Sequence, residues 1–215
     1  QPLDQADIDL ALEAQMVSDA TPLPIGMGAL FVASLSESTL EPPVVVSSDG
    51  EQVAVGRTGQ RIVLPPGHYE VAVGHGDLAR WARASVTVDE GVTTPVRPFF
   101  GGVRVHLVDD AGRPVADQYV LRSIDVGTVY GPVSMTSAAN APRAATWVLP
   151  PGRYVLALGS NANAKSDSMA FSLHAGELLR YRMVVMGGQL LRTELHDEDF
   201  SYEPSIWRLR WTVGG

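Results

Sequence analysis

A six-residue pattern occurs twice in the sequence, and it constrains the fold more than any other feature. Leu-Pro-Pro-Gly-x-Tyr is found at 64–69 and again at 149–154, each time between runs of apolar residues. Such runs are typical of half-buried strands. Two consecutive prolines lack backbone N–H donors and therefore end a strand. Each pattern predicts a strand, a sharp turn and another strand.

Each residue of the turn has a structural role in this prediction. The glycine can take a positive φ at little cost and so turn the chain. The tyrosine buries its ring at a corner of a sandwich, where its hydroxyl needs a hydrogen-bond partner. The pattern is thus the turn of a β-arch and not a chemical site. The predicted structural turn residues are Pro65, Pro66, Gly67 and Tyr69 in the first copy and Pro150, Pro151, Gly152 and Tyr154 in the second.

The repeat extends beyond the turn. When Leu64 is aligned with Leu149, "ASVTVDEGVTTPV" falls on "MAFSLHAGELLRY", which predicts two strands joined by a glycine-containing turn in each copy. Upstream, Gly28 aligns with Gly102 at a smaller offset, so the second copy contains an insertion, which we place within 126–144. Repeated units of this size indicate duplicated domains. The sequence therefore predicts an all-β protein of two tandem antiparallel β-sandwiches.

The second copy carries further marks that resemble a known family. "VRVHLVDDAGRPVADQYVLRS" followed by "TWVLPPGRYVLALG" resembles the carboxypeptidase regulatory-like family. An Asp-x-x-Gly-x-Pro hairpin, here Asp109, Gly112 and Pro114, and a final Leu-Pro-Pro-Gly-x-Tyr recur in that family. The first copy lacks this hairpin order and is more similar to PEGA-type modules. The resemblance implies immunoglobulin-like or transthyretin-like, seven-stranded antiparallel sandwiches that serve as accessory or spacer domains, without catalytic residues.

The N-terminal part differs from the rest in charge. Residues 1–56 include nine acidic side chains and no lysine or arginine, so almost all of the net charge of −8 lies there. Within this part, "DIDLALEAQMVSDA" predicts a short helix with Ile8, Leu12 and Met16 on one face. We expect this helix to pack on the first sandwich or to be partly disordered, or else to dock into a partner. Nucleic acid is not an expected partner, because its binding requires a basic stripe.

No catalytic motif is present in the sequence. There is no nucleophile elbow, no His-Glu-x-x-His, no P-loop and no Gly-x-Gly-x-x-Gly. The five histidines are scattered, and the absence of cysteine excludes disulfides and thiolate metal ligands. "HDED" at 196–199 lacks the spacing of a calcium loop. We therefore predict that the chain is not an enzyme and holds no metal or cofactor.

Two segments are candidates for binding. The loop "GSNANAKSDS" offers Asn161, Asn163 and Asp167 to sugar hydroxyls, with Trp81, Trp147 or Tyr130 as stacking platforms, although ordinary turns have the same composition. The tail "SIWRLRWTVGG" alternates strictly and predicts a strand. That strand either extends the second sandwich, begins a membrane barrel, or, as we predict for 200–215, lies against another chain. The predicted partner-binding residues are Trp207, Leu209, Trp211 and Val213.

These observations predict an organisation and a function. The chain begins at Gln1 and not at Met, as expected of a periplasmic or extracellular protein after removal of a signal peptide. Its longest apolar window is shorter than the ~20 residues of a transmembrane helix. We predict a non-catalytic structural or interaction subunit of a bacterial cell-envelope or extracellular assembly, whose partners are other protein chains. The alternatives are a carbohydrate-binding module and the periplasmic N-terminal part of an outer-membrane β-barrel protein.

The sequence divides into four predicted parts. They are an acidic helical arm with a proline linker (1–26), the first sandwich (27–99), the second sandwich (100–186) and a C-terminal connector and strand (187–215).

Overall fold

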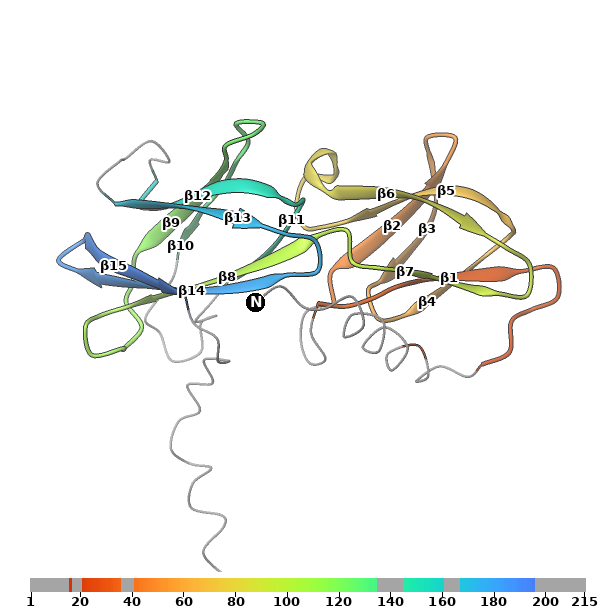
Figure 1. Ribbon diagram of the computed structural model, residues 1–215, viewed down its shortest axis with the longest axis horizontal. Coiled ribbons are helices and arrows are strands. Elements are labelled where there is room, and N and C mark those ends of the chain that lie inside the picture. Colours follow the sequence, from red (N-terminus) through yellow and green to blue (C-terminus); the bar gives the residue numbers. More distant parts are fainter. Residues whose placement is uncertain (1–15, 17–20, 36–40, 135–144, 161–166, 196–215) are drawn as a thin grey trace, which may run out of the picture.

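The computed structural model describes residues 16, 21–35, 41–134, 145–160 and 167–195, and these form two β-sandwiches that lie side by side (Figure 1). The described strands of the first sandwich are β1 (Gly28–Val32), β2 (Pro43–Ser48), β3 (Glu51–Arg57), β4 (Arg61–Leu64), β5 (Gly67–Val73), β6 (Ala82–Val88) and β7 (Thr93–Val96). Those of the second are β8 (Gly101–Val108), β9 (Gln118–Ser123), β10 (Val129–Ser134), β11 (Ala145–Leu149), β12 (Gly152–Leu158), β13 (Ser168–Leu173), β14 (Leu178–Met186) and β15 (Gln189–Leu195). A 3-10 turn, η1 (Leu78–Arg80), precedes β6.

The two sandwiches have the same strand order. In the first, the sheet β4-β1-β7 faces the sheet β3-β2-β5-β6, and in the second β11-β8-β14-β15 faces β10-β9-β12-β13. The strands β1 to β7 thus correspond in order to β8 to β14, which confirms the predicted duplication and the all-β fold. The prediction of wholly antiparallel sheets is wrong at one place in each unit. The first strand pairs in parallel with the seventh, as β1–β7 and as β8–β14, because the chain crosses to the opposite sheet and back between them.

The pairing register corrects the upstream alignment by one position. Gly28 pairs with Leu64, and it is Gly101 that pairs with Leu149, so the equivalent of Gly28 is Gly101 and not Gly102. A Cβ atom at Gly28 would lie 2.2 Å from the carbonyl oxygen of Asp89. One at Gly101 would lie 2.8 Å from the carbonyl oxygen of His174, the residue that aligns with Asp89 in the second copy. Both glycines are therefore required by the same close approach of backbone.

Most of the insertion in the second copy lies where the sequence places it. Five residues, 124–128, connect β9 to β10 where two, 49–50, connect β2 to β3. Ten residues, 135–144, separate β10 from β11 where three, 58–60, separate β3 from β4. The extra length therefore falls between the strands of the second sandwich and leaves its strand order unchanged.

The two Leu-Pro-Pro-Gly-x-Tyr segments form β-arches, as predicted. Each joins strands of opposite sheets, β4 to β5 and β11 to β12. The hydroxyl of Tyr69 donates to the carbonyl oxygen of Pro65 at 2.8 Å, and that of Tyr154 donates to Pro150 at 2.6 Å. The predicted positive φ is wrong for Gly67 and is found for Gly152, at 159°. A Cβ atom at Gly67 would meet the hydroxyl oxygen of Tyr69 at 3.4 Å, which is an ordinary van der Waals contact, so space does not require glycine there either.

Each sandwich has its own apolar core, and an apolar junction connects the two. Val148 points out of the second sandwich, since its neighbours Trp147 and Leu149 pack in that core. It packs instead with Phe99 and Phe100 in the cluster of the first sandwich. Beside this junction, Nη1 of Arg80 donates to the carbonyl oxygen of Val129 at 3.0 Å.

The two ends of the chain differ from the sequence prediction or lie beyond the described residues. Residues 189–195 are strand β15, paired with β14, so the predicted connector is wrong over that stretch. The first sandwich has no such strand among its described residues, because the chain passes from Val96 directly into β8. The predicted helix lies outside the described residues except for Met16, which is helical and packs on Phe31 and Ala33. In the described part of the chain, no helix has the length and apolar character needed to cross a membrane.

Candidate functional site

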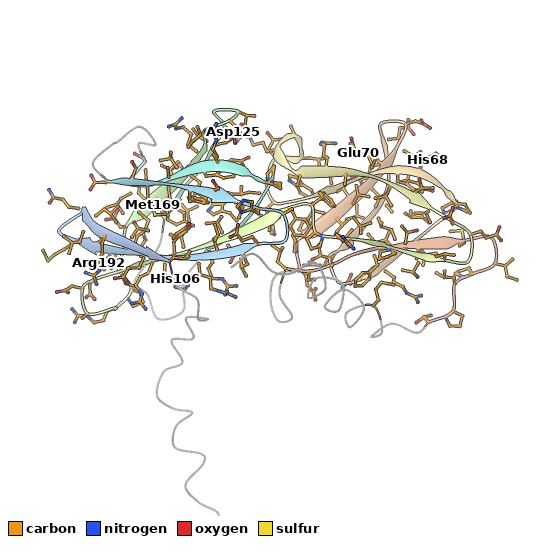
Figure 2. All side chains as sticks on the ribbon, viewed as in Figure 1. His68, Glu70, His106, Asp125, Met169 and Arg192 are labelled. Atoms are coloured by element: carbon orange, nitrogen blue, oxygen red, sulfur yellow. The ribbon has the colours of Figure 1, made fainter. Side chains whose placement is uncertain are left out.

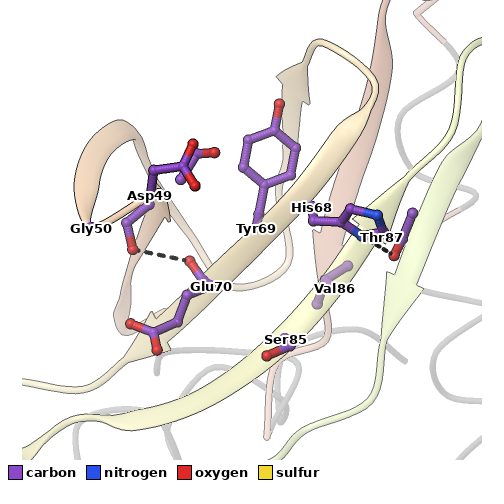
Figure 3. Close-up of a pocket in the computed structure, with 10 residues that line it drawn as sticks. Asp49, Gly50, His68, Tyr69, Glu70, Ser85, Val86 and Thr87 are labelled. Carbon is purple, nitrogen blue, oxygen red and sulfur yellow. Dashed lines mark hydrogen bonds between the residues drawn. The ribbon is translucent and has the colours of Figure 1, made fainter.

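A shallow polar pocket of about 380 Å³ lies on the first sandwich (Figure 3). It is formed by the end of β2 with the following turn, the start of β5 and the end of β6, and it contains His68, Glu70 and Asp49. Asp49 has a φ of 53° and Gly50 a φ of 81°. These values fit the two-residue Asp-Gly turn that joins β2 to β3, so the unusual backbone of Asp49 has a structural cause.

Three of the polar side chains of this pocket, those of Ser47, His68 and Glu70, are paired with groups of neighbouring strands. Nδ1 of His68 lies 2.9 Å from Oγ1 of Thr87. The carboxylate of Glu70 forms an ion pair with Arg83, and the hydroxyl of Ser47 donates to the backbone oxygen of Glu70 at 3.4 Å. A nucleophile oriented by a base would need Ser47 or Thr87 to be activated by a histidine that a third group holds. The described contacts hold no such relay.

Two carboxylates with a lowered pKa, Asp109 and Asp125, serve turns of the second sandwich. Backbone and side-chain hydrogen bonds from Arg113 hold the pKa of Asp109 below its ordinary value and close the predicted hairpin tip. Hydrogen bonds from the N–H and guanidinium of Arg153 do the same for the pKa of Asp125, which ties the β9–β10 turn to the start of β12. Within the ranges that the structure describes, no three histidine or acidic side chains lie close enough to hold a metal ion.

The predicted sugar-binding loop is described in part. Asn161 and Asn163 lie outside the described residues. Asp167 has structural contacts, because its carboxylate accepts the N–H of Leu190 at 3.2 Å and its backbone oxygen accepts the N–H of Leu158 at 2.9 Å. These bonds tie Asp167 to β12, which precedes the loop, and to β15 in the opposite sheet.

The three suggested stacking platforms are packed against the protein. Tyr130 is 9% exposed. Trp147 donates its Nε1 proton to the hydroxyl of Tyr119 at 3.1 Å in the second sandwich. The ring of Trp81 lies over Gly74, where a Cβ atom would be 2.7 Å from it. The suggested stacking role is therefore not supported. The predicted partner residues Trp207, Leu209, Trp211 and Val213 all lie outside the described residues.

Sequence reasoning missed a basic surface on the outer side of the sheet β11-β8-β14-β15. Arg104 pairs directly with Arg180, and Arg182 pairs with His106. Figure 2 shows His106 and Arg192 on this sheet, opposite the layer that carries Asp125. The signal in the sequence was the alternation of basic with apolar residues in "VRVHLV" and "LRYRMVV". We call this surface the arginine face, and its members are Arg104, His106, Arg180, Arg182 and Arg192.

Comparison with known proteins finds only distant likeness. No family model matches the chain, and no curated protein sequence matches it either. Among solved structures, the Bacillus anthracis TIE protein is 16% identical over 74% of this chain, with a TM-score of 0.32, and the chain spans 34% of its length. The tip fimbrial protein Mfa3 of Porphyromonas gingivalis is 10% identical over 79% of this chain and 97% of its own, with a TM-score of 0.35. A putative cell adhesion protein of Bacteroides ovatus is 9% identical over 82% and 96%, with a TM-score of 0.36.

Proposed function

We propose that the chain is a non-catalytic structural subunit of a bacterial cell-envelope or extracellular assembly, in which two docked sandwiches form a spacer of fixed length. The proposal rests on the way the two copies are joined and not on distant likeness to other structures. The resemblance to carboxypeptidase regulatory-like modules, which implies such a spacer role, remains part of the proposal.

The junction between the sandwiches carries the proposal. Only Arg97, Pro98, Phe99 and Phe100 separate β7 from β8, and Phe100 is fully buried in the apolar cluster that Val148 joins from the other side. Domains that are joined by polar linkers move relative to one another, whereas an apolar interface fixes their orientation. Two sandwiches fixed in this way hold their far ends at a constant separation, which is the property that a spacer needs.

The described contacts favour this reading over catalysis. In the pocket on the first sandwich, His68 contacts Thr87 and Glu70 pairs with Arg83, so both side chains link β5 to β6. The perturbed carboxylates Asp109 and Asp125 close turns. The protein should therefore show no turnover above a buffer blank with esterase, glycosidase, peptidase and phosphatase substrates.

The contact with other subunits is assigned in this proposal to residues 200–215. Trp207, Leu209, Trp211 and Val213 alternate with polar residues, and aromatic side chains dominate the energetics of interfaces. The test is a mild affinity purification of the chain from native envelopes, with and without residues 200–215. The shortened chain should keep both sandwiches folded and lose the co-purifying subunits. A shortened chain whose second sandwich unfolds would instead show that the tail is an intramolecular strand.

A variant with Trp207→Ser and Trp211→Ser serves as a second test that keeps the chain length. It should lose the same subunits, because the two indoles contribute the largest apolar area of the tail. The variant Arg208→Gln with Arg210→Gln changes the opposite face of the predicted strand and is the matched control. Equal loss of subunits in both variants would contradict the assignment of the contact to the aromatic face.

A further inference from the structure

The sheets β4-β1-β7 and β11-β8-β14-β15 are equivalent in the two sandwiches, but their outer faces carry different side chains at corresponding positions: apolar in the first and basic in the second. Phe31 pairs with Pro95 in the first sandwich, and Arg104 pairs with Arg180 at the corresponding place in the second. Phe31 points away from the core of its sandwich, because its neighbours Leu30 and Val32 point into it. It is nevertheless only 1% exposed, and Met16 packs against it. Met16 therefore packs on the apolar member of this pair of faces.

The arginine face is the basic member of the pair. Side chains of like charge that lie directly opposite each other destabilise a sheet, and here Arg104 and Arg180 are neighbours in adjacent strands. Glu194 contributes one carboxylate to this face, at 2.5 Å from Nε of Arg192 and 3.7 Å from Nη1 of Arg182. The described side chains of this face consequently carry more positive than negative charge, on a protein whose net charge is −8. A surface of this kind is complementary to a run of carboxylates.

The chain itself contains such a run next to Met16. Asp4, Asp7, Asp9 and Glu13 lie in residues 1–15, and no lysine or arginine occurs before residue 57. The same segment has apolar residues at helical spacing that end at Met16, which is described on Phe31. One face of this segment is thus suited to the apolar sheet of the first sandwich. Its carboxylates are suited to the basic sheet of the second.

The geometry of the two sheets allows one segment to reach both. The sheets β4-β1-β7 and β11-β8-β14-β15 form the lower layer of the molecule in Figure 1. They adjoin at Leu35, whose Cδ1 would lie 3.0 Å from a Cβ atom on Gly102. Fifteen residues span roughly 22 Å as a helix and up to about 50 Å when extended. Either form covers the width of a few strands spaced at about 4.8 Å.

We propose that residues 1–15 dock on the arginine face of the same chain. Met16 anchors the segment on Phe31 of the first sandwich, and the carboxylates upstream of it bind Arg104 and Arg180 of the second. The N-terminal arm is then a strap across the junction that also shields a basic surface. The occupant is this segment and not the tail, which the proposed function assigns to other subunits.

The test uses a single cysteine, because the sequence contains none. A fluorescent dye on Pro2→Cys reports by its anisotropy whether the N-terminus is docked. The anisotropy should be high at low salt and fall as NaCl is raised, since the screening length decreases from about 10 Å at 0.1 M to about 3 Å at 1 M. Arg104→Glu with Arg180→Glu should give the low value at all salt concentrations. Arg57→Glu with Arg83→Glu, on the other layer of the first sandwich, makes the same change in charge and should leave the anisotropy high.

Charge exchange separates docking from a merely structural effect. Asp4→Arg, Asp7→Arg and Asp9→Arg together should release the dye in the parent chain and restore the high anisotropy in the chain that carries Arg104→Glu and Arg180→Glu. Restoration by Asp197→Arg with Glu198→Arg and Asp199→Arg instead would identify the tail as the occupant and overturn the proposal. A high anisotropy that appears only as the protein concentration rises would show docking between copies and would also overturn it. The proposal would also be overturned if Arg104→Glu with Arg180→Glu left the anisotropy at its high value.

Discussion

Gly28 and Gly101 illustrate how the backbone selects a single residue type. Each begins the first strand of its sandwich, and a turn of the same sandwich passes over it. The turn brings the carbonyl oxygen of Asp89 or His174 to the position that a side chain would occupy. Neither glycine has a positive φ, so the requirement is space and not conformational freedom.

Gly28→Ala should therefore destabilise the protein strongly. The new Cβ would lie 2.2 Å from a backbone oxygen, so the strand or the turn must shift, which costs about 1–3 kcal/mol or more. Gly67→Ala is the matched control, because its φ is not positive and its Cβ would meet only the tyrosine ring at 3.4 Å or more. Urea denaturation of both variants measures the difference in the free energy of unfolding. A smaller cost for Gly28→Ala than for Gly67→Ala would contradict the explanation.

Residue patterns predicted the turns well and the pairing register less well. The prolines, glycine and tyrosine of each arch act through local geometry, so they could be recognised without knowledge of the fold. The alignment of Gly28 was wrong by one position because Gly101 and Gly102 are both glycines, and only the approach of a distant turn distinguishes them. Asp167 was predicted to bind a ligand. Its contacts in the structure are with Leu158 and Leu190, which lie in other strands, so the sequence around Asp167 did not reveal them.

At the scale of elements, β15 shows why a strand can escape detection. Its pairing with β14 contains a bulge between Val184 and Val185. Leu191 is the extra residue of β15 at this bulge, because Arg192 pairs with Val184 and Leu190 with Val185. Two leucines therefore follow each other in the sequence, and the alternation that marks a strand is broken. The arginine face was missed for a related reason, since its members come from three strands whose adjacency the sequence does not show. The strand content of each repeat was predictable, and the surface that the repeats create was not.

The aromatic cluster of the second sandwich should make the protein sensitive to alkali. Burial, with a smaller contribution from the charge of Glu177, raises the pKa of Tyr181 to about 12. Burial also raises the pKa of Tyr119 and of Tyr154 above their ordinary value. Because an unfolded tyrosine titrates near 10, the folded state holds protons that the unfolded state releases. This contribution to stability is complete below about pH 10 and is lost as the pH rises through 12.

The midpoint of urea unfolding, measured from pH 8 to pH 12, checks this expectation. It should be steady up to about pH 9 and then decrease, with tyrosinate absorbance appearing together with unfolding. Tyr181→Phe removes one of the titrating groups and should make the decrease less steep between pH 10 and pH 12. An equally steep decrease in that variant would assign the effect to other groups.

At the scale of the whole molecule, the junction decides whether the chain is one body or two. Each sandwich has its own core, and sandwiches of this size can fold independently. What couples them is the apolar contact in which Val148 joins Phe99 and Phe100. Val148 is 5% exposed although it points out of its own sandwich. It packs in the cluster of the first sandwich and not in that of the second, so a substitution there changes the coupling and leaves the core of the second sandwich intact.

Val148→Asp should uncouple the two sandwiches. A carboxylate in this apolar junction has no described partner among Phe99, Phe100 and Leu35, and its desolvation is costly enough to open the contact. We expect the parent chain to unfold in one calorimetric transition and the variant in two, with the separate sandwiches still folded before heating. Val103→Ala is the control, because it weakens the core of the second sandwich by about 0.5–3 kcal/mol and leaves the junction intact. The Val103→Ala variant should unfold at a lower temperature than the parent chain, still in one calorimetric transition. Two transitions in the parent chain would mean that the sandwiches were never coupled, and the spacer of fixed length would have no physical basis.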